Sequence, residues 1–195
     1  MTLMSRRIAL MAGASLLLAS LAVAPAAAAP LESEHYAGSE AGEWSDCGPT
    51  YEFEGTFHGL FTLKAGRAGD PTPYLTDNYS WSWINRNPAN GKWFAEHGNG
   101  QYKDVKITNL HDTVYRFVAQ ESGSPYTIVT SDGRKILMDR GLLRVGFDVD
   151  TQGDSDLEND VFIEGSDTLL GDHGSHPLWH MTGEEYCDIV NDLLG

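Results

Sequence analysis

Residues 51–64 read YEFEGTFHGLFTLK, and this stretch decides the fold. Its odd positions from 51 to 63 are all apolar or glycine, and its even positions are polar except for Leu60. Because successive side chains of a strand point to opposite faces, this alternation predicts a long half-buried strand, or two strands bent at a glycine. Gly55 and Gly59 fall on the apolar side, where we expect a bend or a bulge.

The chain that follows repeats the same kind of pattern. Aromatic residues alternate with serine over 79–83, and apolar residues alternate again over 143–149. The stretch 87–91 (NPANG) predicts a tight turn, and the glycine-rich stretch 97–100 predicts another. About seven to nine short strands separated by turns indicate an all-β fold, either an antiparallel β-sandwich or a barrel.

One α-helix is predicted at the end of the chain. Thr182 suits an N-cap and Glu185 completes a capping box, which places the helix at 183–194. Helical spacing puts Cys187 on the apolar side of this helix, while Cys47 lies just before the first alternating stretch. The sequence therefore predicts a Cys47–Cys187 disulfide that tethers the helix to the sheet, rather than two free thiols.

The first residues have the features of a secretory signal peptide. Arg6 and Arg7 precede an apolar run over 8–23 and a tract of small residues over 24–29. The apolar run is shorter than the ~20 residues that cross a bilayer, which argues against a membrane anchor. We expect cleavage after a signal peptide of residues 1–28 and a secreted, extracellular protein, exported by either the general or the twin-arginine route.

The remaining chain predicts one strongly acidic domain. Its first part, residues 29–46, is rich in Glu, Ser and Gly and is predicted to be a flexible acidic arm before a single β-rich domain at 47–195. Residues 1–28 hold two of the 13 basic residues and none of the 28 acidic ones, so the mature net charge is near −17. Such a charge disfavours nucleic acid and anionic lipid, and it is compatible with cationic partners, with calcium or with solubility alone. We expect no membrane span after the signal peptide.

Five short signatures stand along the chain: LTDNY (75–79), NPANGKWF (87–94), YKDVK (102–106), DRG (139–141) and DTQGD (150–154). Together with the late cysteine, they resemble uncharacterised small exported β-domain proteins of actinobacteria, over about residues 50–190. The resemblance implies export and a β-domain. It implies no activity and no site residues.

An acidic segment follows the last alternating stretch and is a candidate calcium site. Its carboxylates include Asp148, Asp150, Asp154, Asp156 and Glu158. Calcium prefers oxygen-rich loops, but the EF-hand pattern is only half met because Asn159 stands where a bidentate Glu is needed. A weak calcium site and a solvated acidic loop are both open, and we favour the loop.

Three histidines, His173, His176 and His180, form a second cluster that could ligate zinc or copper. Gly174 and Pro177 interrupt any helix that would align them, so a loop leading into the final helix is the alternative that we favour. A transition-metal site is the weaker of the two metal predictions.

The aromatic residues Tyr79, Trp81, Trp83 and Trp93 could stack against a ligand on one sheet face, although alternating aromatics also build cores. The chain lacks a Gly-x-Ser-x-Gly motif and has no cysteine outside the predicted bridge. We therefore expect an exported non-enzymatic binding module of unknown ligand and partners, without a cofactor unless calcium binds. The alternative is a small extracellular β-barrel or sandwich enzyme that acts on a small molecule or a glycan.

Overall fold

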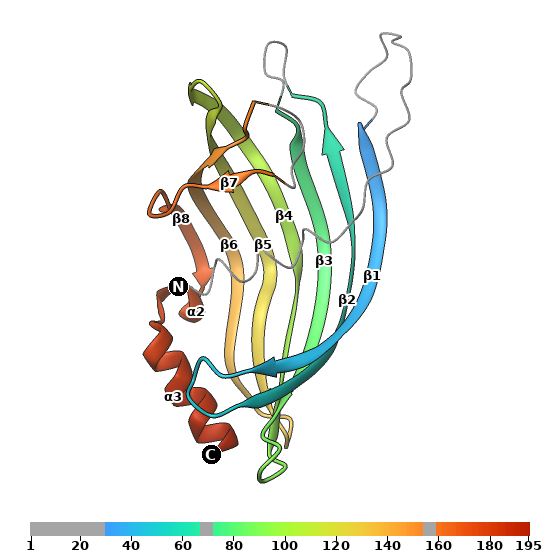
Figure 1. Ribbon diagram of the computed structural model, residues 1–195, viewed down its shortest axis with the longest axis vertical. Coiled ribbons are helices and arrows are strands. Elements are labelled where there is room, and N and C mark those ends of the chain that lie inside the picture. Colours follow the sequence, from blue (N-terminus) through green and yellow to red (C-terminus); the bar gives the residue numbers. More distant parts are fainter. Residues whose placement is uncertain (1–29, 67–71, 154–158) are drawn as a thin grey trace.

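A computed structural model describes residues 30–66, 72–153 and 159–195, so the predicted signal peptide lies outside the described residues. The chain forms one antiparallel sheet that curls into a half-barrel (Figure 1). Its strands are β1 (Glu32–Trp44), β2 (Tyr51–Lys64), β3 (Tyr74–Arg86), β4 (Trp93–His111), β5 (Val114–Thr130), β6 (Lys135–Asp150), β7 (Val161–Phe162) and β8 (Thr168–Ser175). Two helices follow, α2 (Pro177–His180) and α3 (Gly183–Leu194).

The sheet is a meander. Each strand from β1 to β6 pairs antiparallel with the next, and β7 and β8 both pair with β6 at different places along it. The predicted all-β antiparallel fold with a C-terminal helix is confirmed, and the described strands form a single curled sheet. We call its concave side, which carries the odd positions of β2 and β3, the inner face.

The prediction of a flexible arm over 29–46 is wrong for most of that segment. Residues Glu32–Trp44 form β1, which pairs along its whole length with β2, from Glu32 opposite Leu63 to Trp44 opposite Tyr51. The strand escaped detection because its inner positions hold three glutamates and two glycines but only two aromatic residues, Tyr36 and Trp44. Backbone pairing with β2 therefore determines this strand more than burial of its own side chains does.

Six of the inner-face glycines lie beneath aromatic rings of the neighbouring strands. A Cβ atom added to any of them would come within 3.0 Å of such a ring or its hydroxyl. The pairs are Gly38 with Phe57, Gly42 with Phe53, Gly55 with Trp83, Gly59 with Tyr36, Gly98 with Trp81 and Gly100 with Tyr79. Large rings can therefore lie flat over the backbone on the side of the sheet where curvature leaves the least room. The turn predicted at 97–100 is absent: β4 continues through these residues, with a shift in its register against β5 between His97 and Asn99.

The lower end of the half-barrel in Figure 1 is closed by α3. Val190 and Leu194 of α3 are fully buried and pack in one cluster with inner-face residues such as Tyr51, Phe94 and Ile128, which we call the lower cluster. The predicted capping box at Thr182 and the predicted Cys47–Cys187 bridge are both confirmed.

A second group of buried residues, the upper cluster, fills the inner face of β4, β5 and β6 toward the other end. Phe117 and Phe147 stack in parallel there with ring centroids 5.7 Å apart, and Phe162 of β7 lies 5.0 Å from Phe147. Among the described residues, no helix is long and apolar enough to cross a membrane.

Candidate functional site

On β1, β2 and β3 the inner face presents aromatic side chains that stay partly accessible to solvent, and Trp81 among them packs against the lower cluster. Three of the four predicted stacking residues, Tyr79, Trp81 and Trp83, share this face of β3 and are each half-buried. Trp93 pairs with Arg86 and lies on the outer face. The structure therefore brings three of these residues together and separates the fourth.

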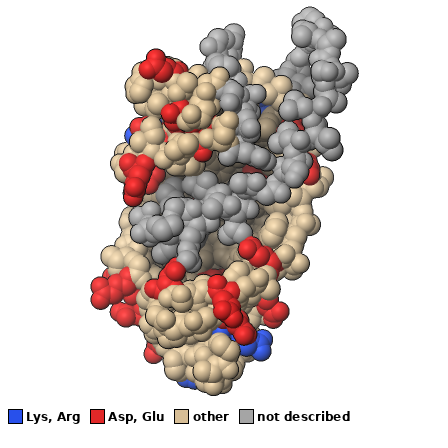
Figure 2. All heavy atoms as spheres, viewed as in Figure 1, with Lys and Arg blue, Asp and Glu red and all other residues tan. Residues whose placement is uncertain are grey.

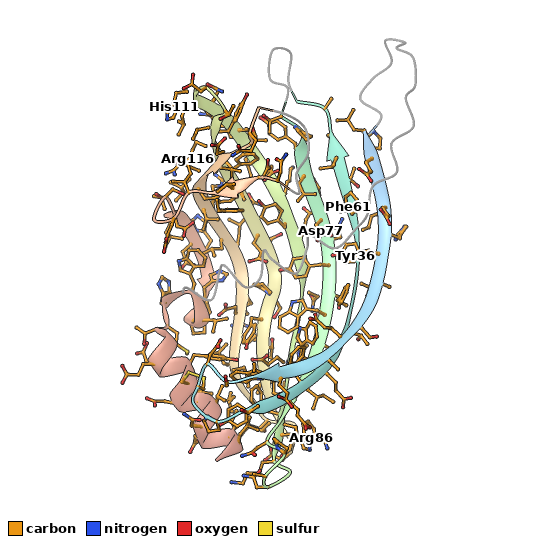
Figure 3. All side chains as sticks on the ribbon, in the orientation of Figure 1. Tyr36, Phe61, Asp77, Arg86, His111 and Arg116 are labelled. Carbon is orange, nitrogen blue, oxygen red and sulfur yellow. A yellow bond between two sulfur atoms is a disulfide. The ribbon has the colours of Figure 1, made fainter. Side chains whose placement is uncertain are left out.

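A tyrosine of β1 reaches across β2 to a carboxylate of β3. Tyr36 lies opposite Gly59, and its hydroxyl donates to both oxygens of Asp77 at 2.8 and 3.1 Å (Figure 3). Asp77 is 2% exposed, and burial raises the pKa of its carboxyl while the Tyr36 hydrogen bond opposes that rise. Burial, with the Asp77 contact, also raises the pKa of the Tyr36 hydroxyl, so the hydroxyl remains a donor at neutral pH.

The same arrangement recurs two strands further along the sheet. Tyr79 of β3 lies opposite Gly100 of β4, and its hydroxyl donates to Oε1 of Glu121 on β5. In each case a glycine of the intervening strand lets the ring pass over the backbone. We call these two contacts, Tyr36–Asp77 and Tyr79–Glu121, the tyrosine bridges; they hold both rings and both carboxylates in fixed positions.

A third carboxylate connects the sheet with α3. Glu96 is 9% exposed and accepts hydrogen bonds from Asn85 Nδ2 at 3.0 Å, from the Tyr186 hydroxyl at 2.7 Å and from the Tyr126 hydroxyl. Trp44 Nε1 donates in turn to Asn85 Oδ1 at 3.0 Å. Because Tyr186 belongs to α3, this network fixes the helix against the lower part of the inner face.

The inner face is negatively charged. Its inward positions carry the carboxylates Asp77, Glu96, Asp104, Glu121 and Asp139, with Glu32, Glu34 and Glu40 on β1. Within the described strands β1 to β6, the same positions hold no Lys, Arg or His. On the surface visible in Figure 2, acidic groups outnumber basic groups, and the most prominent basic groups lie near the lower end. A concave surface with charges of one sign concentrates the electric field in its interior.

Asp104 is an inner carboxylate whose ionisation is strongly perturbed by burial. Its Oδ2 accepts from the Leu75 backbone N–H at 2.8 Å and its Oδ1 from the Tyr102 hydroxyl at 3.0 Å. Burial raises its pKa from 3.8 to about 6, although both hydrogen bonds oppose this rise. Its charged form is therefore held in the fold at a cost in stability.

This shift predicts how stability depends on pH. The folded protein binds the Asp104 proton more tightly than the unfolded chain, so the contribution is full below pH 3.8 and is lost as pH rises through about 6. The free energy of unfolding should fall by about 3 kcal/mol over this window on account of Asp104. Urea titrations at several pH values give the free energy of unfolding at each pH. This free energy should fall less steeply with rising pH for Asp104→Asn than for the wild type. Asp167→Asn, at an exposed position, is the control. The same pH dependence of the unfolding free energy in all three proteins would show that Asp104 is not its source.

The geometry of the Tyr36–Asp77 bridge predicts that a side chain at Gly59 destabilises the fold. A methyl group there would lie 2.3 Å from the Tyr36 hydroxyl oxygen and 2.7 Å from the Asn78 carbonyl oxygen. Gly59→Ala should therefore displace Tyr36 from Asp77 and destabilise the fold by about 1–3 kcal/mol in chemical denaturation. Gly183→Ala is the matched control, since nothing lies within 4 Å of a Cβ at that position in α3. Unchanged stability of Gly59→Ala would show that the ring does not need this space.

Two of the predicted calcium ligands, Asp148 and Asp150, lie within the described residues, and each accepts a hydrogen bond from a neighbouring side chain. Asp148 accepts from Arg116 Nη1 at 2.8 Å, and Asp150 accepts from the Thr113 hydroxyl at 2.6 Å. Asp154, Asp156 and Glu158 lie outside the described residues. Over the ranges that the structure describes, no group of three His, Cys, Asp or Glu side chains is placed to hold a metal ion.

The three predicted metal-binding histidines do not converge. His180 Nε2 lies 2.8 Å from one oxygen of Asp172, and the buried His176 Nε2 lies 3.5 Å from the other. His173 is exposed on β8. Two of the histidines therefore contact one aspartate, next to the short helix α2.

The sequence interpretation missed the inner carboxylates, although a signal for them exists. Asp77 stands in phase with Tyr79, and Glu96 stands in phase with Phe94, so each acid belongs to the apolar side of its alternating strand. A charged residue in phase with buried neighbours is the pattern that would have identified these positions.

No protein-family model matches the chain, and neither a curated protein nor a solved structure is significantly similar to it.

Proposed function

We propose that the domain is an exported, non-enzymatic binding module that holds a small organic molecule against the inner face of the half-barrel. The observation that carries this proposal is the group of half-buried aromatic side chains on the inner face of β1, β2 and β3, which adjoins the lower cluster through Trp81. Concave surfaces lined by aromatic groups and a few fixed polar groups are typical of small-molecule sites.

The rigidity of this face supports binding. The rings lie over glycines, and two tyrosine hydroxyls are fixed by carboxylates, so little side-chain freedom remains to be lost when a ligand binds. The disulfide is consistent with an oxidising compartment outside the cell, which supports the exported location.

Two tryptophans provide a matched test. The neutral fluorescent probe N-phenyl-1-naphthylamine should bind the mature protein saturably, and Trp83→Ala should weaken that binding at least about fivefold by removing an inner-face ring. Trp93→Ala removes an equally half-buried indole from the outer face and should leave the affinity unchanged. Cooperative melting of both variants confirms that they fold.

Amide chemical shifts recorded during the titration locate the probe. Shifts at Tyr36, Tyr79 and Trp83 are expected. Shifts confined to the exposed apolar residues of β7 and β8, such as Phe162 and Leu170, would overturn the proposal, as would equal losses in the two tryptophan variants.

A further inference from the structure

The charge of the inner face restricts the class of ligand that it can hold. Glu121 is half-buried at the centre of this face, and Asp77 is buried two strands away. Each accepts a hydrogen bond from a neutral tyrosine, which orients the carboxylate without neutralising it. Both charges therefore act on anything that enters the concave side.

The aromatic rings beside these carboxylates also favour positive charge. Trp81 and Trp83 lie with ring centroids 6.5 Å apart, and Phe53 meets Trp83 edge-on at 5.5 Å. The faces of indole and phenol rings attract cations, with Trp the strongest of the three aromatic types. Tyr79 joins the two features, because its ring lies next to Trp81 on β3 and its hydroxyl contacts Glu121.

We infer that the inner face binds a positively charged organic molecule, namely a substituted ammonium that carries an apolar group. The ammonium lies against Glu121 and the ring of Tyr79, and the apolar part lies against Trp81 and Trp83. This inference rests on the proposed function and adds the ligand class. A neutral ligand of the same shape leaves the two carboxylates without a counter-charge, and an anion is repelled by them.

Three probes of similar size separate the effect of the ligand's charge on affinity from the effect of its shape. Benzyltrimethylammonium is the cation, neopentylbenzene is its neutral carbon isostere and benzenesulfonate is an anion. Calorimetric titration of the intact, disulfide-bonded protein should give an affinity for the cation at least about tenfold higher than for the neutral isostere, with no measurable binding of the anion. Raising the salt concentration should weaken the binding of the cation alone.

Isosteric variants test whether the charges of Glu121 and Asp77 contribute to binding of the cation. Glu121→Gln and Asp77→Asn keep an acceptor for the tyrosine hydroxyl, so the bridges persist while one charge is lost. Each should lower the affinity for the cation about fivefold and leave that for neopentylbenzene unchanged. Glu52→Gln, on the exposed outer side of β2, makes the same change in net charge and should have no effect.

The outcomes distinguish an error in the ligand class from an error in the proposed function. If the neutral or anionic probe binds the inner face as tightly as the cation, the ligand class is wrong and the proposed function stands. Equal affinities for the cation in Glu121→Gln, Asp77→Asn and the wild type would also overturn the class. If none of the three probes perturbs inner-face amides but N-phenyl-1-naphthylamine does, the ligand class is wrong; if that probe also fails to perturb them, the proposed function itself fails.

Discussion

Reduction of the Cys47–Cys187 disulfide should lower the melting temperature by about 10–15 °C, one of the two largest effects expected for this protein. The bridge joins residues separated by 140 positions, so it removes a large amount of conformational freedom from the unfolded chain. In the chain-entropy account this is worth about 4–5 kcal/mol. Differential scanning calorimetry with and without a reductant measures the shift directly.

The paired variant Cys47→Ala/Cys187→Ala separates loss of the bridge from side effects of the reductant. It should melt at the same temperature as the reduced wild type, and α3 should be the first segment to exchange its amide hydrogens. A shift of only about 1–2 °C would mean that the lower cluster alone, through Val190 and Leu194, holds α3 in place.

Glu96→Ala should destabilise the fold by about 3–5 kcal/mol, because it removes the acceptor shared by two tyrosines and an asparagine in the lower part of the inner face. The loss should include the attachment of α3 through Tyr186. Urea denaturation followed by tryptophan fluorescence gives the free energy, and near-ultraviolet circular dichroism reports on the tyrosine environment.

Two controls accompany this measurement. Glu96→Gln retains one oxygen acceptor and should lose less stability than Glu96→Ala. Glu52→Ala removes an exposed glutamate from the outer face of β2 and should change stability by less than about 0.5 kcal/mol. Similar stabilities for Glu96→Ala and Glu52→Ala would show that the Glu96 network does not support the fold.

The elements that could be predicted from the sequence are those whose own residues show a recognisable pattern. The strict alternation in residues 51–64 corresponds to β2, and the Thr182–Glu185 capping box marks the start of α3. The disulfide followed from the placement of Cys187 on that helix and of Cys47 before the strand. For β2 and α3, neighbouring residues alone determine the element, and the two elements then place the two cysteines of the bridge.

What could not be predicted depends on partners that are distant in the chain. Strand β1 has few apolar inner residues, and its pairing with β2 is visible only in three dimensions. In each tyrosine bridge a tyrosine contacts a carboxylate two strands away, across a glycine of the strand between them. No pattern within one strand indicates such a contact. Trp93 was grouped with Trp83 by residue type, although Trp93 starts β4 in the opposite phase.

The meander has a consequence for how the chain folds. Strands β1 to β6 each pair with their immediate successor, so the sheet can grow by adding one hairpin at a time as the chain becomes available. The contact of α3 with the start of β2 joins the two ends of the described domain and closes a very long loop, as in the Tyr51–Asn191 hydrogen bond. The contacts between residues most distant in the chain are thus made in one late docking step, and formation of the Cys47–Cys187 bridge would fix that step after the sheet has formed.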